Sequence, residues 1–136
     1  LFTDYADKQN LILIGGQPSS HNGENILCGE FALNMISSIN ASAAILGVSG
    51  INAEAGLTSS SPQDIAINKA MLSRTRGKKI VVADYSKIGR VFNFSFSSLK
   101  GITHLVTDSR ADKNELEKMK AANIEVITVN PDENVD

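Results

Sequence analysis

The chain lacks the defining features of several large protein classes. It has a single cysteine, Cys28, among 136 residues, so no internal disulfide can form and a disulfide-stapled secreted scaffold is excluded. Its longest hydrophobic runs are about four residues, as at positions 11–14, whereas a membrane-spanning helix needs about 20. The chain starts with neither a methionine nor a basic signal-peptide region. These absences predict a cytoplasmic protein and indicate a domain taken from a longer polypeptide.

Neither sign of charge dominates the sequence. The 13 lysine and arginine residues and the 15 aspartate and glutamate residues leave a formal net charge of −2. Nucleic-acid binders usually carry a basic field, so the chain is not expected to bind DNA by itself. A hydrophobic fraction of 42% excludes a wholly disordered chain, and the length fits one domain. We expect that domain at residues 1–130 and a polar tail at 131–136.

Short hydrophobic runs alternate with helical patterns along the chain. The runs are rich in valine and isoleucine and end at turn residues, which is typical of strands buried on both faces. Strands are predicted at residues 11–14, 43–46, 79–83, 103–107 and 124–129. Helices are predicted at residues 30–39, 62–75 and 112–123. This alternation is typical of βαβ units, so we predict an α/β fold, a mostly parallel sheet with flanking helices.

Local signals refine two of the helices. Ser61 is the expected N-cap of the second helix, and Asp112 opens the third, which Asn123 ends in a left-handed conformation. Residues 91–96 partly alternate apolar and polar side chains. They are interpreted as an antiparallel edge strand or as a loop packed by aromatic residues.

Candidate binding residues follow the predicted strands, because ligands of open α/β sheets bind beyond the carboxyl ends of the strands. The first such position holds Gly15 and Gly16. Paired glycines allow backbone N–H groups to approach a ligand closely, but a tight turn before Pro18 is the favoured interpretation.

A long loop of small and hydroxyl-bearing residues follows the predicted strand at 43–46. It contains Gly47, Ser49, Gly50 and Asn52, and it leads towards the next helix. Such a loop binds phosphate or sugar hydroxyls through its N–H groups and side-chain oxygens. It lacks the G-K-[ST] of a Walker loop, and an ordinary flexible connection explains it equally well.

An acid and a lysine follow the predicted strand at 79–83. Asp84 leaves the strand, and Lys87 comes three residues later. A carboxylate accepts hydrogen bonds from sugar hydroxyls, and an ammonium group holds a phosphate or carbonyl oxygen. The alternative is a surface turn with a weak ion pair. The position at a strand end favours a binding function.

Other polar positions are explained without a ligand. The polarity of residues 108–112 fits capping of the following helix. Asp64 lies in the first turn of its helix, where a carboxylate opposes binding of an anion. His21 and His104 lack the spacing of metal ligands, and Cys28 is interpreted as a small buried apolar residue.

Four motifs occur in an order that resembles a known family. They are Ile12-Leu13-Ile14-Gly15-Gly16, the glycine-containing segment from Ile45 to Thr58, Asp84-Tyr85-Ser86-Lys87-Ile88-Gly89 and Leu105-Val106-Thr107-Asp108. Together they resemble the C-terminal effector-sensing domain of DeoR-family bacterial transcriptional regulators, over roughly residues 2–129. The family's N-terminal helix-turn-helix, and its first βαβ piece with an Asp-Ser-Gly-Thr-Thr-Thr phosphate loop, have no match in this sequence.

The resemblance implies the fold of ribose-5-phosphate isomerase and CoA transferases, and a phosphorylated sugar as effector. It implies a regulator of sugar metabolism, usually a repressor, that forms a homo-oligomer and contacts operator DNA through a helix-turn-helix outside this chain. No cofactor, metal ion or catalytic residue is expected. The ligand-facing residues that it implies are Gly15, Gly16, Gly47, Ser49, Gly50, Asn52, Asp84 and Lys87.

Two departures and one alternative accompany the resemblance. Ser42 and Asn52 stand where the family commonly has aspartate, so the sugar hydroxyl or amine that meets Asn52 is expected to differ. The alternative is a sugar-phosphate isomerase or deaminase of the same fold. Such an enzyme needs a carboxylate base, for which Asp84 and Glu54 are available, but no paired-carboxylate motif supports it.

Overall fold

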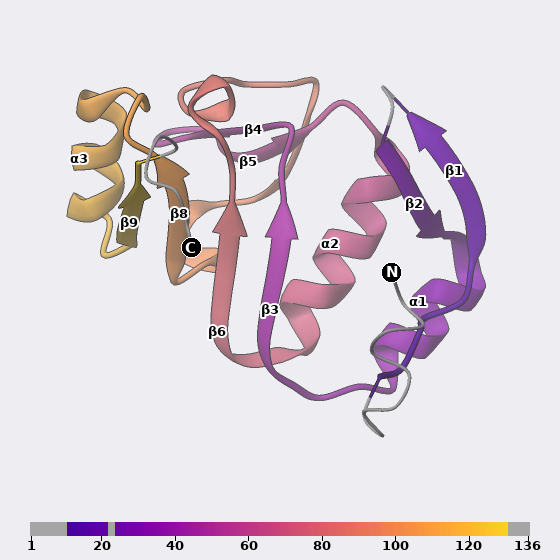
Figure 1. Ribbon diagram of the computed structural model, residues 1–136. Coiled ribbons are helices and arrows are strands. Elements are labelled where there is room, and N and C mark those ends of the chain that lie inside the picture. Colours follow the sequence, from indigo (N-terminus) through magenta and orange to yellow (C-terminus); the bar gives the residue numbers. More distant parts are fainter. Residues whose placement is uncertain (1–10, 22–23, 131–136) are drawn as a thin grey trace.

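The computed structural model describes residues 11–21 and 24–130, and its main element is a four-stranded parallel sheet (Figure 1). The strand order is β3-β6-β8-β9, and every neighbouring pair is parallel. These strands are β3 (Ala41–Gly47), β6 (Thr75–Val82), β8 (His104–Asp108) and β9 (Glu125–Val129). The predicted α/β class with a mostly parallel sheet is therefore confirmed.

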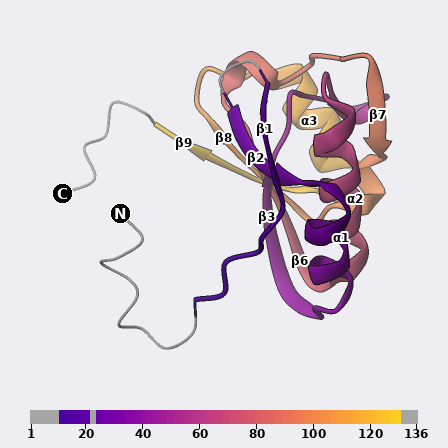
Figure 2. The same cartoon turned by 90° about the vertical axis from the view of Figure 1, so that its right-hand side faces the viewer.

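Three helices accompany this sheet. They are α1 (Gly29–Ser37), α2 (Pro62–Arg74) and α3 (Lys113–Ala121). Figure 2 shows all three on the same side of β3 and β6. On that side the core contains Val81 and Leu105 from the central strands and Met119 from α3, all with no exposed surface. The opposite face of the sheet leaves Ile45 and Val82 exposed, so the expectation of strands buried on both faces is wrong for β3 and β6. The described helices cover one face of these strands, and an apolar run does not show whether a second layer covers the other.

Two smaller antiparallel units complete the described chain. One is the hairpin of β1 (Gln17–His21) and β2 (Glu24–Cys28). The other is a three-stranded sheet, formed by β4 (Gly50–Asn52), β5 (Gly56–Ser59) and β7 (Phe94–Ser97). Strand β7 is antiparallel and lies at the edge of its sheet, so the edge strand considered for residues 91–96 is confirmed from Phe94 onward, whereas residues 91–93 form no strand. The 3₁₀ turns are η2 (Tyr85–Lys87) and η3 (Leu99–Gly101).

The strand expected at residues 11–14 is wrong. Residues 11–16 form no helix or strand, and the chain enters β1 only at Gln17. Leu11, Ile12 and Leu13 are 53%, 75% and 68% exposed, so this hydrophobic run is not part of the described core. A hydrophobic run predicts a buried strand only where a neighbouring strand pairs with it, and the sequence pattern does not contain that information. The Gly15-Gly16 pair consequently does not end a strand of the parallel sheet.

The helix signals are confirmed. The Ser61 hydroxyl accepts a hydrogen bond from the Asp64 N–H at 3.4 Å, so Ser61 caps α2 as expected. The Asp112 carboxylate accepts one from the Glu115 N–H at 2.9 Å and caps α3. Asn123 has a φ of 65°, the left-handed conformation predicted for the end of that helix. Cys28 is buried, as expected.

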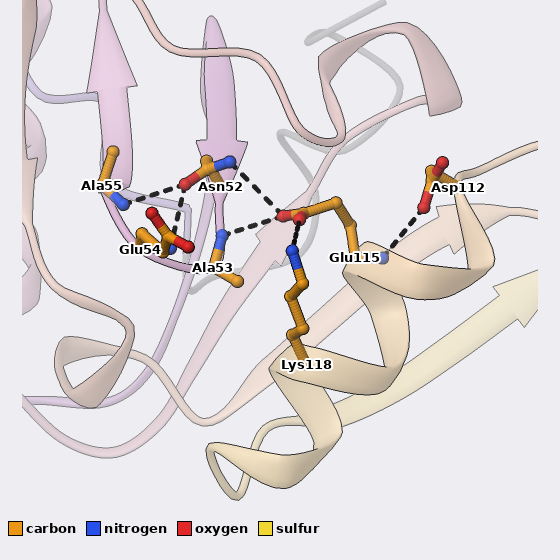
Figure 3. Close-up of polar contacts among 7 residues, drawn as sticks. All are labelled: Asn52, Ala53, Glu54, Ala55, Asp112, Glu115 and Lys118. Carbon is orange, nitrogen blue, oxygen red and sulfur yellow. Dashed lines mark hydrogen bonds and ion pairs between the residues drawn. The ribbon is translucent and has the colours of Figure 1, made fainter.

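A carboxylate on α3 ties this helix to the turn between β4 and β5 (Figure 3). Glu115 Oε2 accepts hydrogen bonds from the Ala53 N–H at 3.0 Å and from Asn52 Nδ2 at 3.4 Å. Lys118 Nζ donates to the other oxygen at 2.8 Å. The bond from Lys118, and after it the bond from Ala53, hold the pKa of Glu115 below its ordinary value.

We expect the Glu115→Gln variant to lose stability at neutral pH and not in acid. Because the pKa is lowered in the folded protein, the carboxylate stabilises the fold above the ordinary glutamate pKa of about 4.3. This contribution disappears as the pH falls through the lowered pKa. At neutral pH the variant should lose about 1.5–3 kcal/mol, the net contribution of a hydrogen bond to a charged group.

Urea unfolding of both proteins at neutral pH and near pH 3 tests this expectation. Glu117→Gln is the matched control, because Glu117 lies on the same helix but its pair with Lys120 is exposed and contributes about 0–1 kcal/mol. A stability difference for Glu115→Gln that does not shrink in acid would refute the proposed role of the charge.

Candidate functional site

A cavity of about 440 Å³ opens beyond the carboxyl ends of β3 and β6. Its walls come from the end of β3 and the loop after it, from β5 and the first turns of α2, and from β6 with the η2 turn. The lining residues are Ile26, Gly47, Val48, Ser49, Ser59, Asp64, Ile67, Asn68, Val82, Ala83, Asp84 and Lys87. This is the position at which α/β sheets bind ligands.

The parallel pairing of β3 and β6 explains why these segments meet. Gly47 lies opposite Val82 in the register, so both strands end at the same edge of the sheet. The chain leaving β3 brings Ser49 to this edge, and the chain leaving β6 brings Asp84. Two segments separated by more than 30 residues therefore contribute to one cavity.

The first turns of α2 form the second wall. Asp64, Ile67 and Asn68 are spaced by three and four residues, which places them on one face of the helix. This face lines the cavity. The Ser61 cap and Pro62 at the first helical position set where α2 begins, and so they set which side chains point to the cavity.

A chain of hydroxyl groups connects the two walls. The Ser59 side chain is buried, and its Oγ lies 3.4 Å from Ser49 Oγ and 3.3 Å from Asp64 Oδ2. The same oxygen accepts a hydrogen bond from the Ser61 N–H at 3.0 Å. The buried hydroxyl thereby orients both the Ser49 side chain and the Asp64 carboxyl group.

The η2 turn presents Asp84 and Lys87. Asp84 Oδ1 accepts a hydrogen bond from the Ser86 N–H at 2.8 Å. Hydrogen bonding from the Ser86 side chain, and after it from this N–H group, lowers the pKa of Asp84. Asp84 is therefore ionised at neutral pH. Lys87 follows within the same turn, so a negative and a positive side chain face one cavity.

Asp108, at the end of β8, braces this turn from the neighbouring strand. Its Oδ2 accepts from the Tyr85 N–H at 2.7 Å, and its Oδ1 accepts from Arg110 Nε at 2.8 Å. The Arg110 guanidinium lies 4.2 Å from the centre of the Tyr85 ring. The interpretation that residues 108–112 serve mainly to cap the next helix therefore holds for Asp112 and is corrected for Asp108. Asp112 makes that cap, and Asp108 holds the turn.

Three polar side-chain groups of the cavity have no hydrogen-bond partner within the part of the chain that the structure describes. They are Asp64 Oδ1, the Asn68 amide and Lys87 Nζ. Because these groups are partly exposed, water solvates them and a ligand can replace that water. The cavity can therefore offer two carboxyl groups, one amide and one ammonium group to a polar molecule.

Half of the sequence-predicted site residues lie in this cavity. Gly47, Ser49, Asp84 and Lys87 line it. The other four have local structural roles. A side chain at Gly16 would meet the Cys28 carbonyl, and one at Gly50 would meet the Arg90 carbonyl. Asn52 Oδ1 accepts hydrogen bonds from the Glu54 and Ala55 N–H groups, and Gly15 packs beside Met35.

Three cavity residues were missed by the sequence interpretation. Asp64 was interpreted as opposing an anion, Ser59 belonged to the hydroxyl-rich loop but was not selected as a site residue, and Asn68 was given no role. One sequence feature could have predicted that Asp64 and Asn68 line the cavity. These two polar residues lie four positions apart on a helix that starts after a hydroxyl-rich loop.

The described residues include neither a metal-binding cluster nor a membrane-spanning helix. Within them, no group of three or more His, Cys, Asp or Glu side chains is placed to hold a metal ion. His104 instead pairs with Glu125, Nε2 to Oε2, at 3.1 Å. The side chain of His21 lies outside the described part. No helix among residues 11–21 and 24–130 is both long and apolar enough to cross a membrane.

Comparison with known proteins identifies relatives that match 73% to 96% of the chain. The chain is 26% identical over 133 residues to the HTH-type transcriptional repressor GlcR of Bacillus subtilis, a match that covers 96% of this chain and 50% of the relative. It is 31% identical over 99 residues to the glycerol-3-phosphate regulon repressor of Escherichia coli, covering 73% and 38%. It is 29% identical over 101 residues to the HTH-type transcriptional regulator GlpR of Haloferax volcanii, covering 74% and 39%.

The chain thus spans half or less of the length of these relatives. A family model described as the DeoR C-terminal sensor domain matches residues 3–109, which confirms the resemblance seen in the four sequence motifs. The chain belongs to the family of DeoR C-terminal sensor domains.

Proposed function

We propose that the chain is the effector-binding domain of a DeoR-type transcriptional regulator of sugar metabolism, usually a repressor, and that it senses a phosphorylated sugar. The match of the sensor-domain model to residues 3–109 is the observation that carries this proposal. The cavity beyond β3 and β6 supports it, because it presents unpartnered polar groups at the place where this fold class binds ligands.

The chemistry of the cavity suits a polar, hydroxylated anion. The Lys87 ammonium group is its one cationic side chain among the described residues, and it binds the phosphate as a point charge. The ionised Asp84 accepts hydrogen bonds from sugar hydroxyls, and Ser49 donates or accepts as required. Effector binding, rather than catalysis, is the role we infer, because the relatives described above are named as transcriptional regulators or repressors.

We further propose that the parent protein is a homo-oligomer that contacts operator DNA through a helix-turn-helix outside residues 1–136. The names of two relatives contain the term HTH-type, and these relatives are at least twice as long as their match to this chain. The net charge of −2 agrees with DNA contacts made elsewhere in the protein.

Melting of the full-length protein with phosphorylated and free sugars tests this function. Glycerol 3-phosphate and glucose 6-phosphate are compared with glycerol and glucose. A ligand at 100 times its Kd stabilises a protein by about 2.7 kcal/mol, so at least one phosphorylated probe should raise the Tm by several degrees. The free sugars should leave the Tm unchanged. Equal shifts with a sugar and its phosphate would contradict a phosphate-directed sensor.

A further inference from the structure

We propose that Asp64 and Asn68 determine which effectors the cavity accepts. In this assignment the α2 wall contacts the neutral, hydroxylated part of the effector, and it disfavours ligands that carry a second negative charge there. The inference rests on the proposed function and extends it, since it restricts the effector to molecules with one anionic group.

The geometry of α2 is the first support. Asp64 and Asn68 lie one helical turn apart on the face that lines the cavity, whereas Lys87 comes from the separate η2 turn. The cavity therefore has a wall with a carboxyl group and an amide, and a different wall with the cation. A ligand whose anion meets Lys87 can extend the rest of its structure towards α2.

The orientation of the Asp64 carboxyl group is the second support. Ser59 Oγ donates to Asp64 Oδ2 at 3.3 Å, and the same serine oxygen is held by the Ser61 N–H. Oδ1 has no hydrogen-bond partner among the described residues. A carboxylate held by a buried hydroxyl, with one oxygen left open, is prepared to accept a hydrogen bond from a ligand hydroxyl.

The balance of charge in the cavity is the third support. Its described residues include two carboxyl groups, Asp64 and Asp84, and one ammonium group, Lys87. One ligand anion is matched by Lys87. A second anion at the α2 wall would face Asp64 with no described cation lining the cavity beside it, so like-charge repulsion would weaken binding.

Paired ligands that differ by one carboxylate test the inference. One pair is glycerol 3-phosphate and 3-phosphoglycerate; the other is glucose 6-phosphate and 6-phosphogluconate. Kd values are measured by calorimetry on the full-length protein. In the pair whose first member binds, we expect the additional carboxylate to weaken binding by at least tenfold in the wild type. The ratio of the two Kd values, with and without the carboxylate, should fall at least fivefold in the Asp64→Asn variant. The substitution removes the repelling charge, and the asparagine side chain keeps the size of aspartate and one carbonyl oxygen acceptor.

Three further variants make the result specific. Glu117→Gln removes one negative charge from an exposed position on α3 and should leave the ratio unchanged. Asn68→Leu should weaken both members of the pair by about fivefold, the value of one hydrogen bond, and leave the ratio unchanged. Asp64→Ser also removes the charge and keeps a short hydroxyl acceptor at this helix position. It replaces Asp64→Asn in the comparison of Kd values if that variant does not fold.

The outcomes separate the inference from the function beneath it. If a phosphorylated probe binds the wild type but neither Asp64 variant narrows the ratio, the specificity role is overturned and the sensor function stands. If no probe binds the wild-type protein, the proposed function falls and the specificity role falls with it. A smaller Kd ratio in the Asp64 variants, with an unchanged ratio in Glu117→Gln, supports both the specificity role and the sensor function.

Discussion

The Lys87→Ala variant should lose the effector's influence on operator binding while it still folds and binds DNA. Lys87 is the cation that lines the cavity among the described residues, and its ammonium group makes no hydrogen bond to a described side chain, although it interacts electrostatically with Asp84. A charge-assisted hydrogen bond contributes about 1.5–3 kcal/mol, so the affinity for a phosphorylated sugar should fall about 10- to 150-fold. The described interaction of this side chain within the protein is its electrostatic one with the exposed Asp84, and exposed pairs contribute little. Stability should therefore change by less than about 0.5 kcal/mol.

Operator binding with and without glycerol 3-phosphate or glucose 6-phosphate measures this effect, with melting curves recorded alongside. Lys113→Ala is the matched control, because Lys113 is an exposed lysine at the start of α3, away from the cavity lining. An unaltered response in Lys87→Ala would return this lysine to the alternative interpretation, a solvated surface turn.

The Gly56→Ala variant should be destabilised by about 2–4 kcal/mol, from backbone strain together with overpacking. Gly56 has a φ of 74°, in the left-handed region that side chains other than glycine rarely adopt. A Cβ atom there would lie 2.2 Å from the Ser97 carbonyl oxygen and 2.8 Å from Ser98 Cα. Both contacts are with backbone atoms of the chain at the end of β7, so a side-chain rotation cannot relieve them.

Gly47→Ala is the matched control for the stability loss expected of Gly56→Ala. A Cβ atom at Gly47 would meet nothing within 4 Å, and this glycine has no positive φ. Its free energy of unfolding in urea should stay within about 0.5 kcal/mol of the wild-type value. Equal stability of Gly56→Ala and wild type would show that the β5–β7 contact is looser than described.

Much of the fold was predictable because its signals are local. The valine- and isoleucine-rich runs around Val81 and Leu105 form strands of the parallel sheet, and the caps at Ser61 and Asp112 mark the helix starts. The strand-end rule also placed Asp84 and Lys87 in the cavity, because it depends only on knowing where a strand stops.

Other features depend on contacts between distant segments, which one sequence does not reveal. The run at residues 11–14 has the composition of a strand but no partner strand among the described residues. The polarity of residues 108–112 was attributed mainly to capping of the helix that follows, yet Asp108 holds a turn that leaves the neighbouring strand β6. Asn52 faces Glu115, which is 63 positions away. Asp64 has a sufficient local explanation as a first-turn acid, so nothing in the sequence required it to line a cavity.

The central claim is that the effector binds beyond the carboxyl ends of β3 and β6, and the most direct test is to locate it by NMR. Backbone amide shifts of the ¹⁵N-labelled full-length protein are followed during titration with glycerol 3-phosphate and with glucose 6-phosphate. The account predicts that the largest changes cluster at Ser49, Ser59, Asp84 and Lys87 and leave most of α3 unaffected. Saturable changes centred on α3 or on the β1–β2 hairpin, with the cavity amides unmoved, would contradict it.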